Sequence, residues 1–375
     1  MPRKIFLIAC EASGDLHGAH LVGELKKICP DMLFCGIGGA QMVEAGVRIF
    51  HDMTQISALG LGDVLRNYFK YRKIFYETLG RIEKEKPDCV ILIDSPAFNL
   101  RLAKKISKKV PVIYYISPQL WAWGGRRIHV VRKHVHKMLV ILPFEKELYQ
   151  KAGVPCSFVG HPLLDCIPES KDNASIRSSL GIPAGQKAIG LFSGSRESEV
   201  RRILPIMLQA ASYLQQDLPK TVFFLSRSPN DILKKFPIKT ETPSVPFYDL
   251  VRAMDFALVT SGTATLETAL LGTPFFLLYK TSWSTYLLGR HLIRVRYLGL
   301  VNLLAKKSVV PEFIQNDAHP ETIAHEAKIF LKSPELQQDM RLEFLKAKTQ
   351  LGEKGASRKA AYEVIQFLDK IGKKN

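Results

Sequence analysis

The stretch KIFLIACEASGDLHGAH (residues 4–20) contains, in order, a short apolar run, a turn of small residues and the start of a helical pattern. Its apolar run has no alternating polar positions, which predicts a strand that is buried on both faces. A strand of this kind that leads into a helix is typical of a parallel sheet with helices on either side. The stretch therefore predicts an α/β fold.

The same strand–turn–helix pattern recurs on both sides of one interruption. Before it, we predict strands at 32–37, 89–93, 111–116 and 137–142 and helices at 16–28, 62–84 and 99–109. After it, we predict strands at 188–192, 221–226, 256–260 and 275–279 and helices at 200–215 and 263–271. Two such series predict two Rossmann-like, doubly wound domains that face a ligand cleft at the carboxyl ends of their strands.

The interruption is rich in proline, serine and charged residues and marks the domain boundary. We expect an N-terminal domain over residues 1–165, a hinge over 166–185 and a C-terminal domain over 186–335. Residues 336–375 have the pattern of a charged helical tail. That tail either crosses back to the N-terminal domain or contacts another subunit, so an oligomer remains open.

Composition indicates a globular protein with anionic partners. Of the 375 residues, 46% are hydrophobic and 23% are charged, and the formal net charge is +18. This charge favours phosphates, acidic lipids or nucleic acid without distinguishing them. The first apolar run is too short for a signal peptide, no later segment is apolar enough to span a membrane, and the six cysteines form no CxxC pair. We therefore expect a cytoplasmic protein with reduced thiols.

Two turns in the C-terminal half have the composition of phosphate-binding sites. In LFSGSRESEVRR (191–202), Gly194 and Ser195 precede a helix and Arg196 adds a guanidinium suited to phosphate oxygens. In TSGTATLETALLGTPF (260–275), the second turn consists of four small residues, and Glu267 follows where a carboxylate could bind ribose hydroxyls. The small residues are Ser261, Gly262, Thr263 and Ala264. Two such turns indicate a nucleotide, although each is also compatible with an ordinary capped helix.

In the N-terminal half, polar residues follow two buried strands. Ser13, Gly14, Asp15 and His17 follow the strand at 4–9 and are candidates to face the cleft. Asp94 ends the strand at 89–93, where it either acts as a general base or caps the next helix. The GxGxxG dinucleotide fingerprint is missing and no DxD triplet occurs in the chain, so we expect neither a metal nor another cofactor.

A basic, aromatic stretch follows the strand at 111–116. SPQLWAWGGRRIHVVRKHVHK (117–137) contains Trp121 and Trp123, and residues 95–144 include ten Lys or Arg and no acid. The tryptophans either pack the loop or touch a lipid. An earlier predicted helix, 60–82, has aromatic and basic residues at helical spacing, which fits either a core-facing stripe or a helix lying on anionic lipid. Its candidate membrane residues are Tyr68, Phe69, Arg72, Phe75 and Tyr76.

Seven blocks, in this order, resemble the lipid A disaccharide synthase family. They are EASGDLHGAHL, LIDSPAFNLRLAKK, YYISPQLWAWGGRR, LPFEKELYQKAGVPCSFVGHPLLD, GSRESEVRR, SGTATLETAL and VNLLA. The resemblance covers residues 4 to about 305. It implies an inverting GT-B glycosyltransferase, peripheral on the cytoplasmic face of the inner membrane. Its implied reaction transfers diacylglucosamine from a UDP-diacylglucosamine donor to a diacylglucosamine 1-phosphate acceptor and forms the β-1,6-linked lipid A disaccharide 1-phosphate and UDP.

The resemblance also implies residue roles. Asp94 matches the proposed base, Arg196 a required arginine, Glu267 the ribose-binding position and Asn302 a polar residue of the donor site. Ala97 stands where some members have a second acid. Two rival functions remain: another GT-B sugar-nucleotide enzyme, similar to a UDP-GlcNAc 2-epimerase, and a basic nucleic-acid-binding protein. The chain lacks a nucleic-acid recognition motif, so we expect no nucleic acid among its partners.

Overall fold

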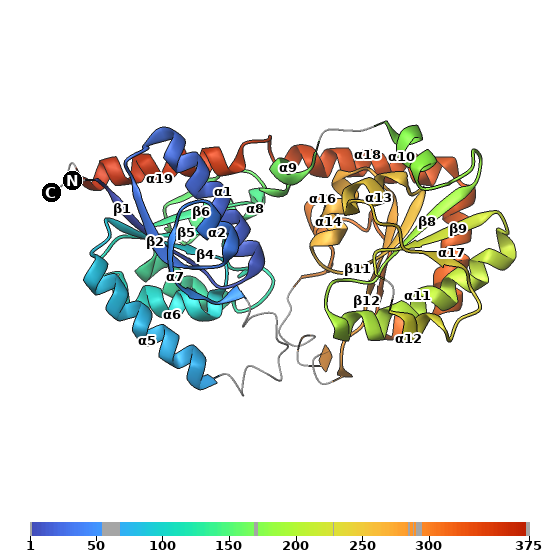
Figure 1. The fold of residues 1–375 in the computed structure, drawn as a ribbon, viewed down its shortest axis with the longest axis horizontal. Helices are drawn as coiled ribbons and strands as arrows, with labels where there is room; N and C mark the ends of the chain where they lie inside the picture. The colour runs from blue at the N-terminus through green and yellow to red at the C-terminus, as the bar shows by residue number, and fades with distance from the viewer. Residues whose placement is uncertain are drawn as a thin grey trace. The chain divides into compact units, whose positions relative to one another are not determined.

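The computed structural model describes residues 2–54, 68–168, 172–227, 229–283, 286, 287, 289 and 295–372. The chain divides into two compact units, one comprising residues 1–165 and 351–375 and the other residues 166–350. Figure 1 shows their helices and strands. No helix within the described ranges has the length and apolarity needed to cross a membrane.

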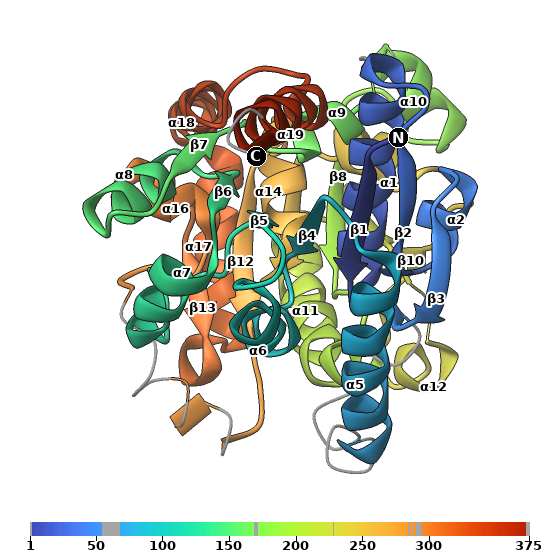
Figure 2. The same ribbon diagram turned by 90° about the vertical axis from the view of Figure 1, so that its left-hand side faces the viewer.

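The first unit is built on a seven-stranded parallel sheet of order β3-β2-β1-β4-β5-β6-β7. Figure 2 shows this order running from β3 on the right to β7 on the left. The strands are β1 (Lys4–Ala9), β2 (Leu33–Gly38), β3 (Arg48–Asp52), β4 (Cys89–Ile93), β5 (Val112–Tyr115), β6 (Lys137–Val140) and β7 (Cys156–Phe158).

Helices cover both faces of this sheet, because its strands are apolar on both sides. Phe6 and Ile8 of β1 belong to one hydrophobic cluster, whereas Ile5, Leu7 and Ala9 belong to the other. In Figure 1, α1 and α19 lie on one side of the sheet and α5, α6 and α7 on the other. The helices are α1 (Ala12–Ile28), α2 (Ala40–Glu44), α5 (Tyr68–Glu85), α6 (Pro96–Ile106), α7 (Ile128–His134), α8 (Pro143–Lys151), α9 (Leu163–Cys166) and α19 (Ala356–Gly372).

The second unit is built on a six-stranded parallel sheet of order β10-β9-β8-β11-β12-β13. Its strands are β8 (Lys187–Phe192), β9 (Thr221–Leu225), β10 (Thr240–Glu241), β11 (Phe256–Thr260), β12 (Phe275–Tyr279) and β13 (Glu312–Ile314). Its helices are α10 (Asn173–Ser179), α11 (Glu197–Asp217), α12 (Asn230–Leu233), α13 (Phe247–Ala253), α14 (Thr263–Leu270), α16 (Leu300–Ala305), α17 (Pro320–Lys332) and α18 (Pro334–Gln350). Both units therefore have the predicted doubly wound, parallel architecture.

Candidate functional site

Asp94 lies at the carboxyl end of β4, beside the end of β1. Asp94 and Ser95 both have left-handed backbones, with φ of +47° and +44°. This conformation costs a non-glycine residue about 1–2 kcal/mol. The Asn99 Nδ2 donates to the backbone oxygens of Ile93 and Asp94 at 3.0 and 2.8 Å, and the Tyr114 hydroxyl donates to the Asp94 oxygen at 2.5 Å. These bonds hold a strained turn and thereby fix the position of Asp94.

The environment of Asp94 suits it to accept a proton near neutral pH. Burial, and then the negative charge of Glu11, raise the pKa of the Asp94 carboxyl to about 6. Glu11 follows β1, whose last residue, Ala9, pairs with Ile93 of β4, so both acids lie at one edge of the sheet. Glu11 was not among the predicted site residues. Its position two residues beyond the first strand was the signal available for it.

The residues predicted from the start of α1 have different environments. Asp15 is 3% exposed and accepts hydrogen bonds from the backbone N–H groups of Gly39, Gln41 and Met42 at 2.6, 3.0 and 3.3 Å. Asp15 therefore stabilises the start of α2, which differs from the expectation that it faces a ligand. Gly14 is also buried, whereas Ser13 is exposed.

His17 is an uncharged imidazole at neutral pH. Burial, and then the charge of His20, lower the pKa of His17 to about 4. In the described part of the chain, its buried Nδ1 has no hydrogen-bond partner. His17 therefore keeps a polar atom that a ligand could satisfy.

The two tryptophans of the 117–123 loop differ in exposure. The Trp121 indole N–H donates to the Glu145 carboxylate at 3.0 Å, and its ring packs edge-on against Phe144 with centroids 5.2 Å apart. Trp123 is 38% exposed, and the Arg127 guanidinium lies 4.5 Å from its ring centroid. Trp121 therefore packs the loop, whereas Trp123 presents an aromatic surface with a cation on it.

In the second unit, one cavity of about 480 Å³ collects all the predicted nucleotide-site residues except Asn302. It lies where β8 and β11, neighbouring parallel strands, lead into α11 and α14. Eight predicted residues line it: Gly194, Ser195, Arg196, Ser261, Gly262, Thr263, Ala264 and Glu267. The turns have backbones that favour glycine, with φ of +98° at Gly194 and +151° at Gly262. The two turns therefore form one site.

Polar groups around this cavity fit an anionic ligand. The Arg196 side chain is 72% exposed and pairs with Glu199 at 3.2 Å, so it can exchange that partner for a phosphate. Arg227 donates to the backbone oxygen of Ser195 at 2.6 Å and also lines the cavity. Within the described ranges, the buried hydroxyls of Ser193 and Thr260 have no hydrogen-bond partner. Arg227 was not among the predicted site residues, and its only sequence signal was its position just after the strand at 221–226.

Glu267 and Asn302 differ in their availability to a ligand. The Tyr248 hydroxyl donates to Glu267 at 2.9 Å, and burial raises the pKa of Glu267. Asn302 is fully buried and is absent from the cavity lining. Its amide donates to Val310 and Glu312 and accepts from the N–H groups of Val309 and Val310, at 2.7–2.8 Å. These bonds use the full capacity of the Asn302 amide, so it joins α16 to β13 instead of touching a ligand as expected.

The candidate membrane residues of α5 do not share one face. Phe69 and Tyr76 are 76% and 59% exposed, and Arg72 lies 5.9 Å from the Tyr76 ring centroid. Phe75 packs against the core and meets Phe98 with ring centroids 5.5 Å apart, so it differs from the expectation of a membrane residue. Residues 55–67 lie outside the described residues, as does the side chain of Tyr68.

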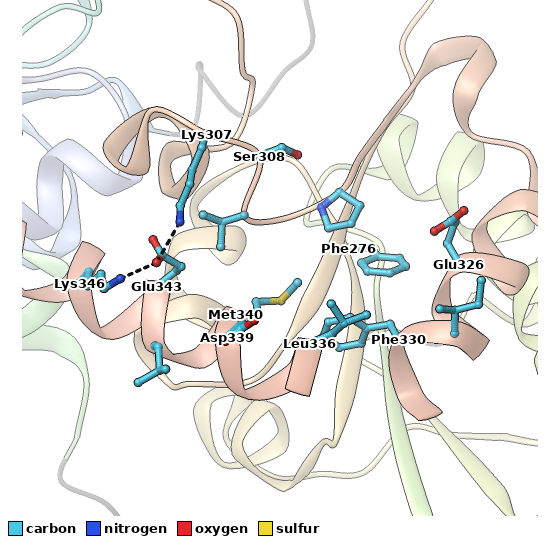
Figure 3. Close-up of a pocket in the computed structure, with 14 residues that line it drawn as sticks. Phe276, Lys307, Ser308, Glu326, Phe330, Leu336, Asp339, Met340, Glu343 and Lys346 are labelled. Atoms are coloured by element: carbon cyan, nitrogen blue, oxygen red, sulfur yellow. Dashed lines mark hydrogen bonds and ion pairs between the residues drawn. The ribbon is translucent and has the colours of Figure 1, made fainter. Parts of the chain in front are cut away.

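A second cavity, of about 500 Å³, contains none of the predicted residues. Figure 3 shows an apolar part with Phe276, Phe330, Leu336 and Met340, and Lys307 and Lys346 pointing toward Glu343. In the chain as described, no group of three or more His, Cys, Asp or Glu is arranged to hold a metal ion. The 480 Å³ cavity therefore remains the candidate nucleotide site.

The sequence is similar to one family along almost its whole length. A family model described as Lipid-A-disaccharide synthetase matches residues 5–365. Lipid-A-disaccharide synthase 1 of Legionella pneumophila (strain Lens) is 41% identical over 359 residues, which cover 93% of each chain. Lipid-A-disaccharide synthase of Syntrophus aciditrophicus (strain SB) is 41% identical over 378 residues, which cover 98% of each chain.

Solved structures with low sequence identity share the fold. The S. aureus MnaA–UDP co-structure has a TM-score of 0.66 at 13% identity and covers 98% of this chain and 97% of its own. The glycotransferase of kitacinnamycin has a TM-score of 0.64 at 14% identity and covers 98% and 99%. These likenesses confirm the predicted fold class of two Rossmann-like domains, as in GT-B glycosyltransferases and epimerases.

Proposed function

Because this chain belongs to the lipid-A-disaccharide synthetase family, and is thus a glycosyltransferase of lipid A biosynthesis with a UDP-sugar donor and a sugar-phosphate acceptor, we propose its full reaction. The donor is UDP-2,3-diacylglucosamine and the acceptor is 2,3-diacylglucosamine 1-phosphate. The products are the β-1,6-linked lipid A disaccharide 1-phosphate and UDP. The observation that carries this proposal is the cavity of the second unit, which brings two phosphate-type turns, an arginine and a carboxylate together.

In the proposed donor site, residues 186–335 bind the UDP moiety. The N–H groups at Gly194–Ser195 and at 261–264 contact the pyrophosphate together with Arg196, and Glu267 accepts from the ribose hydroxyls. Asn302 acts indirectly, by holding α16 against β13. Fixed positive groups of this kind stabilise the charge that develops on the departing UDP.

In the proposed acceptor site, residues 1–165 provide the base. The acceptor 6-hydroxyl oxygen attacks C1 of the donor sugar while its proton passes to the Asp94 carboxylate. The bond from C1 to the UDP oxygen breaks, and its electron pair leaves with UDP, so C1 is inverted. Ser13, His17 and the 117–123 loop surround the acceptor, and its phosphate meets the basic residues that follow this loop.

The proposed location is the cytoplasmic face of the inner membrane, with peripheral attachment. Exposed Phe69 and Tyr76 of α5 enter the headgroup region, and Arg72 meets anionic lipid. Helices α6 and α7, which carry many of the ten basic residues between 95 and 144, cover the same face of the sheet as α5. A net charge of +18 supports this attachment.

Mass spectrometry of the products tests the proposed reaction. Purified protein is incubated with acceptor and with either UDP-2,3-diacylglucosamine or unacylated UDP-GlcNAc. We expect disaccharide 1-phosphate and an equal amount of UDP only from the acylated donor. Epimerisation of UDP-GlcNAc, with no disaccharide from the acylated donor, would contradict the proposal and favour an epimerase.

A further inference from the structure

The 117–123 loop begins with a strained turn. Ile116 follows β5 with φ of +61°, a left-handed backbone that is rare for a β-branched residue. Its N–H remains bonded to the backbone oxygen of Leu139 at 3.0 Å, so the strain is tied to the sheet. Backbone strain of this kind persists only where the surroundings hold it. The residues that hold the start of the loop therefore decide its conformation.

Glu145 accepts two side-chain hydrogen bonds from this loop. It lies in the first turn of α8 and is 1% exposed. One carboxylate oxygen accepts from the Ser117 hydroxyl at 2.7 Å and from the Trp121 indole N–H at 3.0 Å. The other accepts from the Leu142 N–H at 3.2 Å. A single buried carboxylate thus joins both ends of the SPQLW segment to α8.

The donors around Glu145 require a carboxylate. Glu145 is the acceptor in all three bonds, through both of its carboxylate oxygens. An amide at this position could accept only through its one oxygen. No basic side chain forms an ion pair with Glu145 among the described residues. Burial raises the pKa of Glu145 to about 7, while the bonds from Ser117, Trp121 and Leu142 oppose that rise. Burying this acid costs free energy, and the hydrogen bonds that it accepts offset part of that cost.

The loop also lies next to Asp94. Strands β4 and β5 pair with Ile93 opposite Tyr115, so Asp94 and Ser117 follow neighbouring strands. Asp94 N–H donates to the backbone oxygen of Tyr115 at 3.1 Å. A second contact from α8 holds the loop, because the Tyr149 hydroxyl donates to the Pro118 oxygen at 3.2 Å.

We propose that Glu145 is a positioning residue, which fixes the 117–123 loop by accepting hydrogen bonds from Ser117 and Trp121 and so prepares the acceptor site. The role in the acceptor site rests on the proposed function. That Glu145 fixes the loop rests on the hydrogen bonds alone.

The kinetic test compares Glu145→Gln with Glu147→Gln. Glu147 lies on the same helix and pairs at the surface with Lys151, so its variant controls for the change of charge. Because Glu145→Gln turns one accepting atom into a donor, we expect the acceptor KM to rise about 10-fold while the donor KM stays within about twofold. Trp121→Phe should have a similar effect, since it removes the donor and keeps the ring on Phe144. The double variant should then be little worse than either single variant.

Hydrogen exchange provides a readout without substrate. We expect residues 117–123 to exchange faster in Glu145→Gln and in Trp121→Phe, with the wild-type rate in Glu147→Gln. Unchanged exchange, or an acceptor KM equal to that of the control in a folded variant, would overturn the positioning role. If the wild-type protein made no disaccharide, the proposed function would fail. The exchange data would still decide whether Glu145 fixes the 117–123 loop.

Discussion

Asp94 combines a strained backbone with a half-buried acid, and both are costs to folding. Its left-handed φ of +47° is held by Asn99 and Tyr114, which are themselves buried. The sequence DSPAFN allowed either a base or a helix cap at this position. The Ser95 side chain makes no cap bond at α6, and the Asp94 carboxyl accepts a backbone bond from Ser95, which leaves its other acceptor positions available for chemistry.

For activity, we expect Asp94→Asn to lower kcat by about 10²–10⁴-fold, the usual contribution of a general base. The donor KM should remain unchanged, because Asp94 lies in the other unit from the candidate nucleotide cavity. In the wild type, kcat/KM should rise with pH through about 6, the pKa of the Asp94 carboxyl, since only the ionised form accepts a proton. Steady-state assays from pH 5 to 8 measure both effects. Near-wild-type turnover by the variant would show that another group is the base.

For stability, the raised pKa of Asp94 predicts that Asp94→Asn becomes more stable than the wild type as pH rises. The folded state binds this proton more tightly than the unfolded state, so the stabilisation is complete below the unfolded pKa and is lost as pH rises through about 6. Asp94→Asn should therefore be more stable than the wild type at pH 8 by roughly 1–3 kcal/mol and similar to it near pH 4. Urea unfolding at the two pH values measures the difference. An equal difference at both would contradict the assigned pKa.

Two other polar residues show which contacts of the site could not be predicted from the sequence. Asp15 was predicted from its place after the first strand and Asn302 from the family resemblance, yet each bonds to backbone from another part of the chain. The partners of Asp15 are 24–27 residues away along the chain, and the sequence contains no signal for that contact. The glycine and serine turns were predictable, because their chemistry is local to one strand–helix junction.

At the scale of elements, strands in the centre of each sheet were easier to predict than strands at the edges. The strands at 4–9 and 89–93 match β1 and β4, whose residues are apolar on both faces. Four edge strands were not predicted: β3 and β7 in one sheet and β10 and β13 in the other. β7 and β13 have three residues each and β10 has two, too few for a hydrophobic period to show.

The aromatic side chains of α5 give opposite predictions for membrane binding and stability. Phe69→Ser should reduce flotation with anionic liposomes by roughly 10-fold, because it removes the exposed ring that we propose enters lipid, and should lower the thermal midpoint less than Phe75→Ser does. Phe75→Ser should lower the unfolding free energy by roughly 2–3 kcal/mol, because it removes packing against Phe98 and the core. Flotation and thermal unfolding of both variants separate the two roles. Unchanged flotation of Phe69→Ser would remove α5 from the membrane surface.

At the scale of the whole molecule, the chain ends in the unit where it begins. Ala360, Val364 and Leu368 of α19 share a hydrophobic cluster with Leu21 and Leu25 of α1. The amphipathic pattern of this tail predicts a helix with a buried face, but a pattern does not specify which surface covers that face. Each unit thus has its own core, and the first is completed only by the last residues of the chain.

This division predicts that UDP stabilises one unit more than the other. The cavity that collects Arg196 and Glu267 belongs entirely to residues 166–350. Free UDP at about 100 times its Kd should stabilise that unit by about 2.7 kcal/mol, because it binds only the folded state. Hydrogen exchange should slow at 192–196 and 260–267 and remain unchanged in β1 and β4.

Arg196 should account for much of this effect. Arg196→Ala should weaken UDP binding by roughly 10–100-fold through the loss of charge-assisted bonds to phosphate, so the same UDP concentration would protect little. Arg202→Ala removes an exposed arginine from the same helix, outside the cavity, and should bind UDP as the wild type does. Equal losses of UDP affinity in both variants would mean that UDP binding depends on the overall positive charge and not on Arg196. If UDP slowed hydrogen exchange in the unit of Asp94 instead, the nucleotide site would lie in that unit and the assignment to residues 166–350 would be wrong.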